Sequence, residues 1–77
     1  MHTSLKDLLI GERAKISVND SSDISPKYIE LGLTPGAVIE IKTKAPFGGP
    51  ISVKLVKNNV LLALRKQEAQ SILIEKL

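Results

Sequence analysis

Apolar and polar residues alternate in several short segments of this chain, which predicts β-strands. In the segment 13–18, Ala14, Ile16 and Val18 share one face and polar residues occupy the other, as in a half-buried strand. The same alternation recurs at 38–43 and at 51–56. In these two segments the residues predicted to face the core are Ile39, Ile41, Thr43, Ile51, Val53 and Leu55. Two shorter strands are predicted at 60–64 and 72–75.

Helix and turn signals separate these strands. A helical turn is predicted at 3–8, where Thr3 or Ser4 can cap the first amides. A two-turn helix is predicted next, with Ser25 as its N-cap, Pro26 at its first position and Gly32 as a left-handed terminator. Turns are predicted at Asn19, Asp20 and Asp23, at Pro35 and Gly36 as a type II turn, and at 57–59 as a tight turn. A helical turn is predicted at 65–71.

Several short, closely spaced strands in 77 residues predict a mainly β fold, a small closed or nearly closed barrel whose ends are covered by the short helices. No internal repeat or linker interrupts the pattern, so residues 1–77 are expected to form one domain. Tyr28 is expected to pack at one end of this barrel. Outward positions on its strands could join into an apolar patch that supports weak homodimerisation; they are Val38, Val56, Leu61 and Leu73.

The amino-acid composition bears on the cellular location of this domain and on its possible partners. The chain has no cysteine, which suits a reducing compartment, so a cytoplasmic location is expected. The longest apolar run, at 60–64, is far too short to span a bilayer, and no direct membrane insertion is expected. The net charge of +3 permits only weak attraction to nucleic acid, and 3% aromatic residues offer little stacking. Lys42, Lys44 and Lys54 share the outward parity of two strands, and an ordinary solvated face is preferred over a specific nucleic-acid contact.

Chemical motifs are sparse. The only histidine is His2, beside the initiator Met, where a frayed terminus is expected rather than a catalytic or metal-binding role. Asp20 and Asp23 could form a weak cation site, but local turn formation explains them better. No phosphate-binding or metal-ligand motif is present in the sequence. We therefore expect no enzymatic activity, no cofactor and no tight metal site.

Three segments in order, "YIELGLTPGAVIEI", "APFGGPISVKL" and "LALRKQEAQSILIE", resemble the FeoA family of small proteins in bacterial ferrous iron transport. The segment "LKDLLIGERAKI" is similar to the family's opening. The specific features are the order and spacing of LGL, PG, the proline-bracketed glycines, and LR followed by EA. Most of these residues are expected to be structural: Leu31, Gly32, Leu33, Pro35, Gly36, Leu64, Arg65, Glu68 and Ala69. Of these, Leu31, Leu33, Leu64 and Ala69 are expected in the core, and Arg65 and Glu68 as a surface pair.

The resemblance implies an SH3-like β-barrel without enzymatic activity that acts on FeoB, a membrane transporter with a cytoplasmic GTP-binding domain. It also implies a family-level association with transition-metal ions. The same module occurs at the C-terminal end of iron-dependent repressors, but the present chain leaves no room for a DNA-binding domain, so the standalone transport form is expected. The alternatives left open are a small nucleic-acid-binding barrel and a self-associating relative of the repressor module.

The segment 45–50 is the candidate partner-binding loop of this chain. It comprises Ala45, Pro46, Phe47, Gly48, Gly49 and Pro50. Two prolines stiffen the loop and two glycines allow a sharp reversal, so an apolar side chain can be presented at low entropic cost. Phe47 stands where smaller aliphatic residues are common in the family. Two interpretations stay open: Phe47 is a knob that enters a groove of a partner, or it is a lid over an open barrel end.

Overall fold

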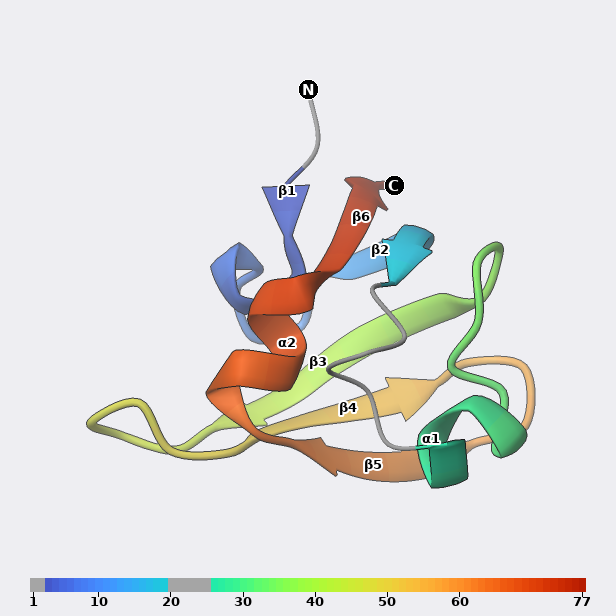
Figure 1. Cartoon of the computed structure of the whole chain (residues 1–77). Coiled ribbons are helices and arrows are strands. Elements are labelled where there is room, and N and C mark those ends of the chain that lie inside the picture. The colour runs from blue at the N-terminus through green and yellow to red at the C-terminus, as the bar shows by residue number, and fades with distance from the viewer. Residues whose placement is uncertain (1–2, 20–25) are drawn as a thin grey trace.

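The structure, a computed structural model, describes residues 3–19 and 26–77 (Figure 1). Its strands are β1 (Thr3–Ser4), β2 (Arg13–Asn19), β3 (Val38–Lys44), β4 (Ile51–Leu55), β5 (Val60–Leu64) and β6 (Ile72–Lys76). Its helices are the 3-10 helix η1 (Leu5–Asp7), α1 (Pro26–Glu30) and α2 (Lys66–Ser71). The predicted strands are therefore all present. The pairing of β1 with β6 was not predicted, because two residues are too few to show an alternation.

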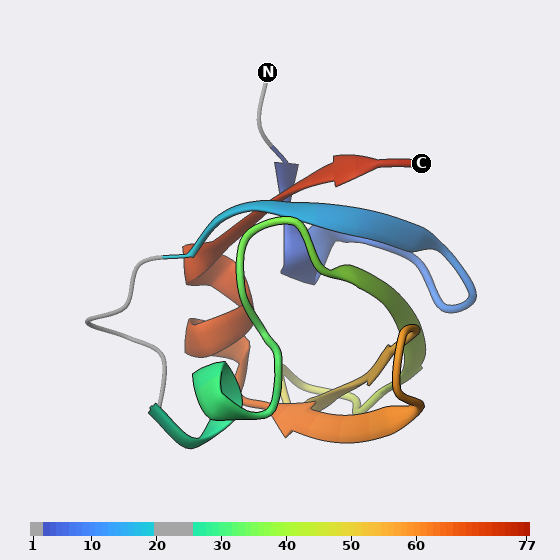
Figure 2. The same cartoon turned by 90° about the vertical axis from the view of Figure 1, so that its right-hand side faces the viewer.

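The strands form one six-stranded antiparallel sheet in the order β1-β6-β2-β3-β4-β5. The sheet curls around a central core, which confirms the predicted small β-barrel (Figure 2). Two register shifts help it to curve, one in β2 between Ile16 and Val18 and one in β3 between Ile41 and Thr43. The connecting helix α2 lies on the side where β5 and β6 separate, so it closes the wall of the barrel rather than one end (Figure 2).

The core contains most of the side chains that the alternation predicts. These are Ala14, Ile16, Ile39, Ile41, Ile51, Val53 and Leu55, joined by Leu33, Leu64 and Ala69 from the motif segments. The prediction for Thr43 is wrong, since its side chain is exposed. The register shift after Ile41 adds a residue to β3 and reverses the parity of the positions that follow. The structure does not describe the side chain of Val18.

Leu31 was also expected in the core and is instead 37% exposed. Gly32 follows it with a φ of +115°, and this left-handed residue turns the chain so that Leu33 enters the core in its place. The predicted end of α1 at Gly32 is confirmed. Tyr28 packs against the core, and its hydroxyl donates a hydrogen bond to the carbonyl of Ala63 (2.9 Å), which ties α1 to β5.

Local turn chemistry agrees with the sequence at two further places. The Ser4 hydroxyl accepts a hydrogen bond from the Lys6 amide (3.3 Å) at the start of η1. Gly36 has a φ of +93°, and the Ala37 amide donates to the Thr34 carbonyl (3.0 Å), as the predicted turn requires. The predictions for His2, Asp20, Asp23 and Ser25 fall outside the described residues.

Candidate partner-binding loop

The loop 45–50 connects β3 to β4 and projects away from the barrel (Figure 1). The Ala45 amide donates to the Pro50 carbonyl (3.0 Å), and the Gly49 amide donates to the Pro46 carbonyl (3.2 Å). The second of these bonds closes a four-residue β-turn with Phe47 and Gly48 at its centre. Backbone hydrogen bonds thus give the loop a defined shape.

Both central residues of this turn have positive φ, +59° at Phe47 and +73° at Gly48. Positive φ at both central positions is the mark of a type I′ turn, which favours Asn or Asp followed by Gly. Gly48 therefore meets a backbone requirement, as expected. Gly49 meets a spatial one, because a Cβ built there would lie 2.7 Å from the Ala45 Cβ.

Phe47 is the unusual residue of the turn. Its side chain is fully exposed, so the interpretation of Phe47 as a lid over the barrel end is wrong. A bulky residue at positive φ carries backbone strain, which in folded proteins is concentrated at functional sites. Within the chain, Phe47 therefore has an unfavourable backbone conformation and no burial that would offset it.

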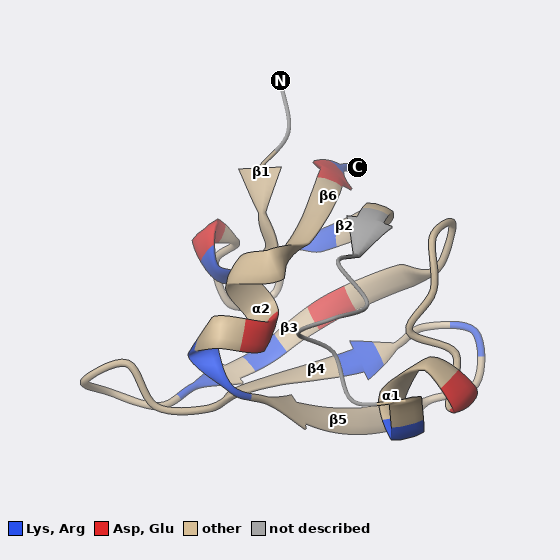
Figure 3. Cartoon of the chain, viewed as in Figure 1, with Lys and Arg blue, Asp and Glu red and all other residues tan. Residues whose placement is uncertain are grey.

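Basic side chains surround the base of this loop. Lys6 from η1, Lys44 at the end of β3, and Arg65 and Lys66 at the start of α2 form what we call the basic cluster (Figure 3). The Lys44 Nζ donates to the Lys6 carbonyl (2.8 Å), which fixes one ammonium group against η1. The Lys66 Cδ would lie 3.3 Å from a Cβ built on Gly48, so its aliphatic stem rests against the turn.

Two small hollows lie between the basic cluster and the loop. One of about 250 Å³ lies between residues 48–50 and the start of α2, and its lining includes Arg65 and Lys66. The other, of about 160 Å³, includes Lys6, Lys44 and Lys66 in its lining. Within the part of the chain that the structure describes, no Asp or Glu lines either hollow. The base of the loop that carries Phe47 is therefore cationic.

The lysines singled out on β3 and β4 do not form one uniform face. Lys42 Nζ lies 3.0 Å from Glu40 Oε2, and Arg13 Nε lies 2.8 Å from Glu40 Oε1. These two cations lower the pKa of Glu40 to about 2. Lys54 is the cross-strand partner of the same Glu40, whereas Lys44 turns toward η1. A carboxylate thus lies among the lysines of this face.

Leu73 does not join the other three residues of the expected apolar patch. Val38 and Val56 are neighbours, since the Val56 amide donates to the Val38 carbonyl (3.0 Å). Leu61 lies opposite Lys54 on β5, and Leu73 lies on β6, which β2 and β3 separate from β4. Leu73 is therefore separated from Val38, Val56 and Leu61, which lie on or beside the adjoining strands β3 to β5. Val38 and Val56 instead line a groove of about 760 Å³ between the end of α1 and the β4–β5 turn.

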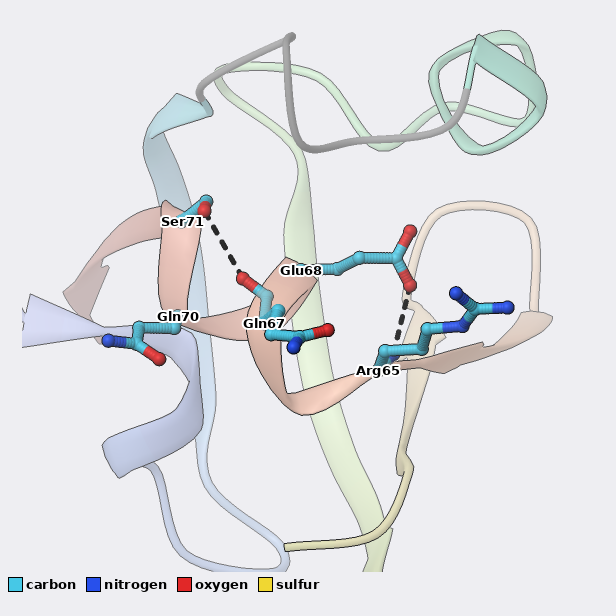
Figure 4. Close-up of a pocket in the computed structure, with 5 residues that line it drawn as sticks. All are labelled: Arg65, Gln67, Glu68, Gln70 and Ser71. Carbon is cyan, nitrogen blue, oxygen red and sulfur yellow. Dashed lines mark hydrogen bonds between the residues drawn. The ribbon is translucent and has the colours of Figure 1, made fainter.

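A further hollow, of about 680 Å³, lies against α2 and is polar (Figure 4). It is lined by Arg65, Gln67, Glu68, Gln70 and Ser71. The Glu68 carboxylate accepts a hydrogen bond from the Arg65 main-chain amide (2.9 Å), and the Ser71 hydroxyl donates to the Gln67 carbonyl (3.2 Å). The expected side-chain pair of Arg65 and Glu68 is therefore a helix cap, in which the carboxylate satisfies a free amide.

Two negative findings concern the described residues alone. Among residues 3–19 and 26–77, no three His, Cys, Asp or Glu side chains gather closely enough to hold a metal ion. No helix in the same part of the chain has the length and apolarity needed to cross a bilayer.

Comparison with known proteins identifies the family. A family model for the FeoA domain matches residues 3–76. This chain belongs to the FeoA domain family. The NMR structure of a FeoA-like protein from Clostridium acetobutylicum is 34% identical and has a TM-score of 0.81, covering 99% of this chain and 87% of that chain. A comparison with curated protein sequences gives no match.

Other FeoA relatives support the fold assignment. The crystal structure of FeoA from Stenotrophomonas maltophilia, complexed with zinc and described as a prokaryotic SH3 domain protein, is 26% identical, with a TM-score of 0.76 over 95% of this chain and 89% of that chain. A manganese-dependent transcriptional repressor is 18% identical and has a TM-score of 0.85 over 99% of this chain and 37% of that chain, which shows a shared fold. The predicted SH3-like barrel of the FeoA family is thus confirmed.

Proposed function

We propose that this FeoA domain protein is a small cytoplasmic accessory protein of bacterial ferrous iron uptake, working as a single domain. The family is linked to ferrous iron transport, and this supports the general role. We assign the chain no catalytic step. Its action would be a contact with a FeoB-like membrane transporter that carries a GTP-binding domain.

The contact surface in this proposal is the loop 45–50, and the observation that carries it is the state of Phe47. The backbone that carries the exposed Phe47 ring is already held by hydrogen bonds before a partner arrives, so little backbone entropy is lost on binding. Aromatic residues of this kind are common energetic anchors of protein interfaces. The apolar groove near Val38 and Val56 has no comparable projecting residue.

The test is the affinity of this protein for the full-length FeoB-like transporter of the same organism, purified in nanodiscs. We expect Phe47→Ala to weaken binding by about 1 to 3 kcal/mol, as for a modest interface anchor. Leu61→Ala is the matched control, since Leu61 is also exposed and lies on β5. It should bind as the wild type does. If Phe47→Ala also binds as the wild type does, the loop is not the docking surface.

A further inference from the structure

We infer that the surface on the partner that receives Phe47 is an apolar pocket with an acidic rim, and that the basic cluster contacts this rim. This inference rests on the proposed function, because it concerns the same loop. It adds the chemistry of the partner: a protein surface rich in Asp and Glu around a pocket large enough for one aromatic ring.

The cations of the basic cluster lie against the loop that carries the Phe47 ring. Lys66 lies against Gly48, the residue that follows Phe47, and Lys44 directly precedes the loop. Lys6 comes from a distant part of the sequence but is joined to Lys44 through its main-chain carbonyl (2.8 Å). A partner that buries Phe47 must therefore approach these ammonium groups, and carboxylates opposite them would offset the cost of removing water from them.

The cations of the basic cluster form no ion pair with an Asp or Glu in the part of the chain that the structure describes. Among the described residues, the ion pairs involve Arg13 and Lys42 with Glu40, and Lys76 with Glu12. No member of the basic cluster takes part in them. The pKa of Glu12 is lowered mainly by the hydrogen bond from the Leu9 amide and by Lys76, and to a smaller extent by Lys44, which forms no ion pair with it. Glu68 is engaged as the cap of α2. The positive charge around the loop is thus available to a partner.

The arrangement of the cations favours an acidic protein surface over a nucleic acid as the partner. A nucleic acid is bound by a stripe of cations that follows its phosphates, usually with several aromatic rings for the bases. Here the cations gather at the base of one loop that presents a single exposed ring, and the neighbouring lysines on β3 and β4 lie beside Glu40. A compact site of this shape fits an acidic protein surface better than a long polyanion.

The test measures binding to the same nanodisc-embedded transporter as salt is varied, with Lys66→Glu as the variant. Glu is favourable in the first turn of a helix, so this change is compatible with α2. We expect Lys66→Glu to weaken binding about tenfold at low salt, mainly through slower association, and the difference to shrink at high salt. Lys57→Glu is the control for net charge, because Lys57 is exposed in the β4–β5 turn. It should change the affinity about twofold or less.

The outcomes separate the two proposals. If Phe47→Ala weakens binding while Lys66→Glu and added salt do not, the acidic rim is refuted and the docking loop stands. If neither variant has an effect, both fail. Tight binding of a 20-base-pair DNA duplex at physiological salt, abolished by Lys66→Glu, would also overturn the inference, because it would assign the basic cluster to phosphates.

Discussion

Phe47 has a backbone conformation that its own side chain disfavours. Positive φ suits Gly, Asn and Asp, and a β-turn with two such positions is found mostly with those residues. The ring is exposed in the isolated protein, so no burial of its side chain offsets this strain. A residue that reduces stability and projects into solvent is typical of a site kept for binding, where stability and activity oppose each other.

The backbone strain at Phe47 predicts a stabilising substitution. Phe47→Asn should raise the free energy of unfolding by about 0.5 to 1 kcal/mol, because Asn accepts the left-handed conformation and suits the turn. Phe47→Ala should stay within about 1 kcal/mol of the wild type, as truncations at the surface usually do. Urea denaturation of the three proteins measures both values. A loss of about 3 kcal/mol or more in either variant would mean that the ring is packed in solution.

At the scale of elements, Glu40 links β2 to β3. It accepts from Arg13 of β2 and from Lys42 of its own strand, and these cations lower its pKa from 4.5 to about 2. A carboxyl with a lowered pKa in the folded protein stabilises the fold above its unfolded pKa. That contribution is lost as the pH falls from 4.5 toward 2, where the group becomes protonated in the folded state too.

Glu40→Gln should therefore remove an acid-dependent part of the stability. We expect the variant to be less stable than the wild type at pH 7, the difference to shrink as the pH falls from 4.5 toward 2, and the difference to vanish only below the folded-state pKa, where both side chains are neutral. Thermal unfolding followed across this range tests the prediction. Glu30→Gln is the control, since Glu30 takes part in none of the ion pairs among the described residues. A difference between wild type and Glu40→Gln that stays constant with pH would contradict it.

At the scale of the whole molecule, the arrangement of the strands in the barrel limits how strongly the protein can self-associate. The sheet has two edges, β1 and β5, and β1 is only two residues long. The Tyr28 hydroxyl donates a hydrogen bond to the Ala63 carbonyl, so α1 covers part of β5. Leu73 is separated by β2 from the outward residues on or beside β3 to β5, so the four outward apolar residues do not form one continuous patch.

We expect the protein to be a monomer in weak exchange with a dimer. Sedimentation velocity between nanomolar and high micromolar concentration should show a single small species that grows heavier only at the upper end. Leu61→Lys, on the exposed face of β5, should remove any concentration dependence that arises from that strand. A dimer that persists at nanomolar concentration would favour the self-associating, repressor-like alternative instead.

The sequence by itself determined the elements and most of the core, because these depend on interactions between near neighbours. Alternation placed Ile39, Ile41 and Val53 inward, and turn residues such as Gly32 and Gly36 marked where the chain reverses. The FeoA motifs likewise predicted the fold. The loop 45–50 was recognisable as a stiff turn from its prolines and glycines alone.

Only the tertiary structure decided where the loop's side chain points and which charges surround it. Lys6, Lys44 and Lys66 are far apart in the chain, and no periodicity in the sequence links them; η1, β3 and α2 bring them together because the sheet closes into a barrel. The exposure of Thr43 was decided in the same way, by a register shift between two strands. Both features depend on contacts between distant segments, whose geometry no local pattern specifies.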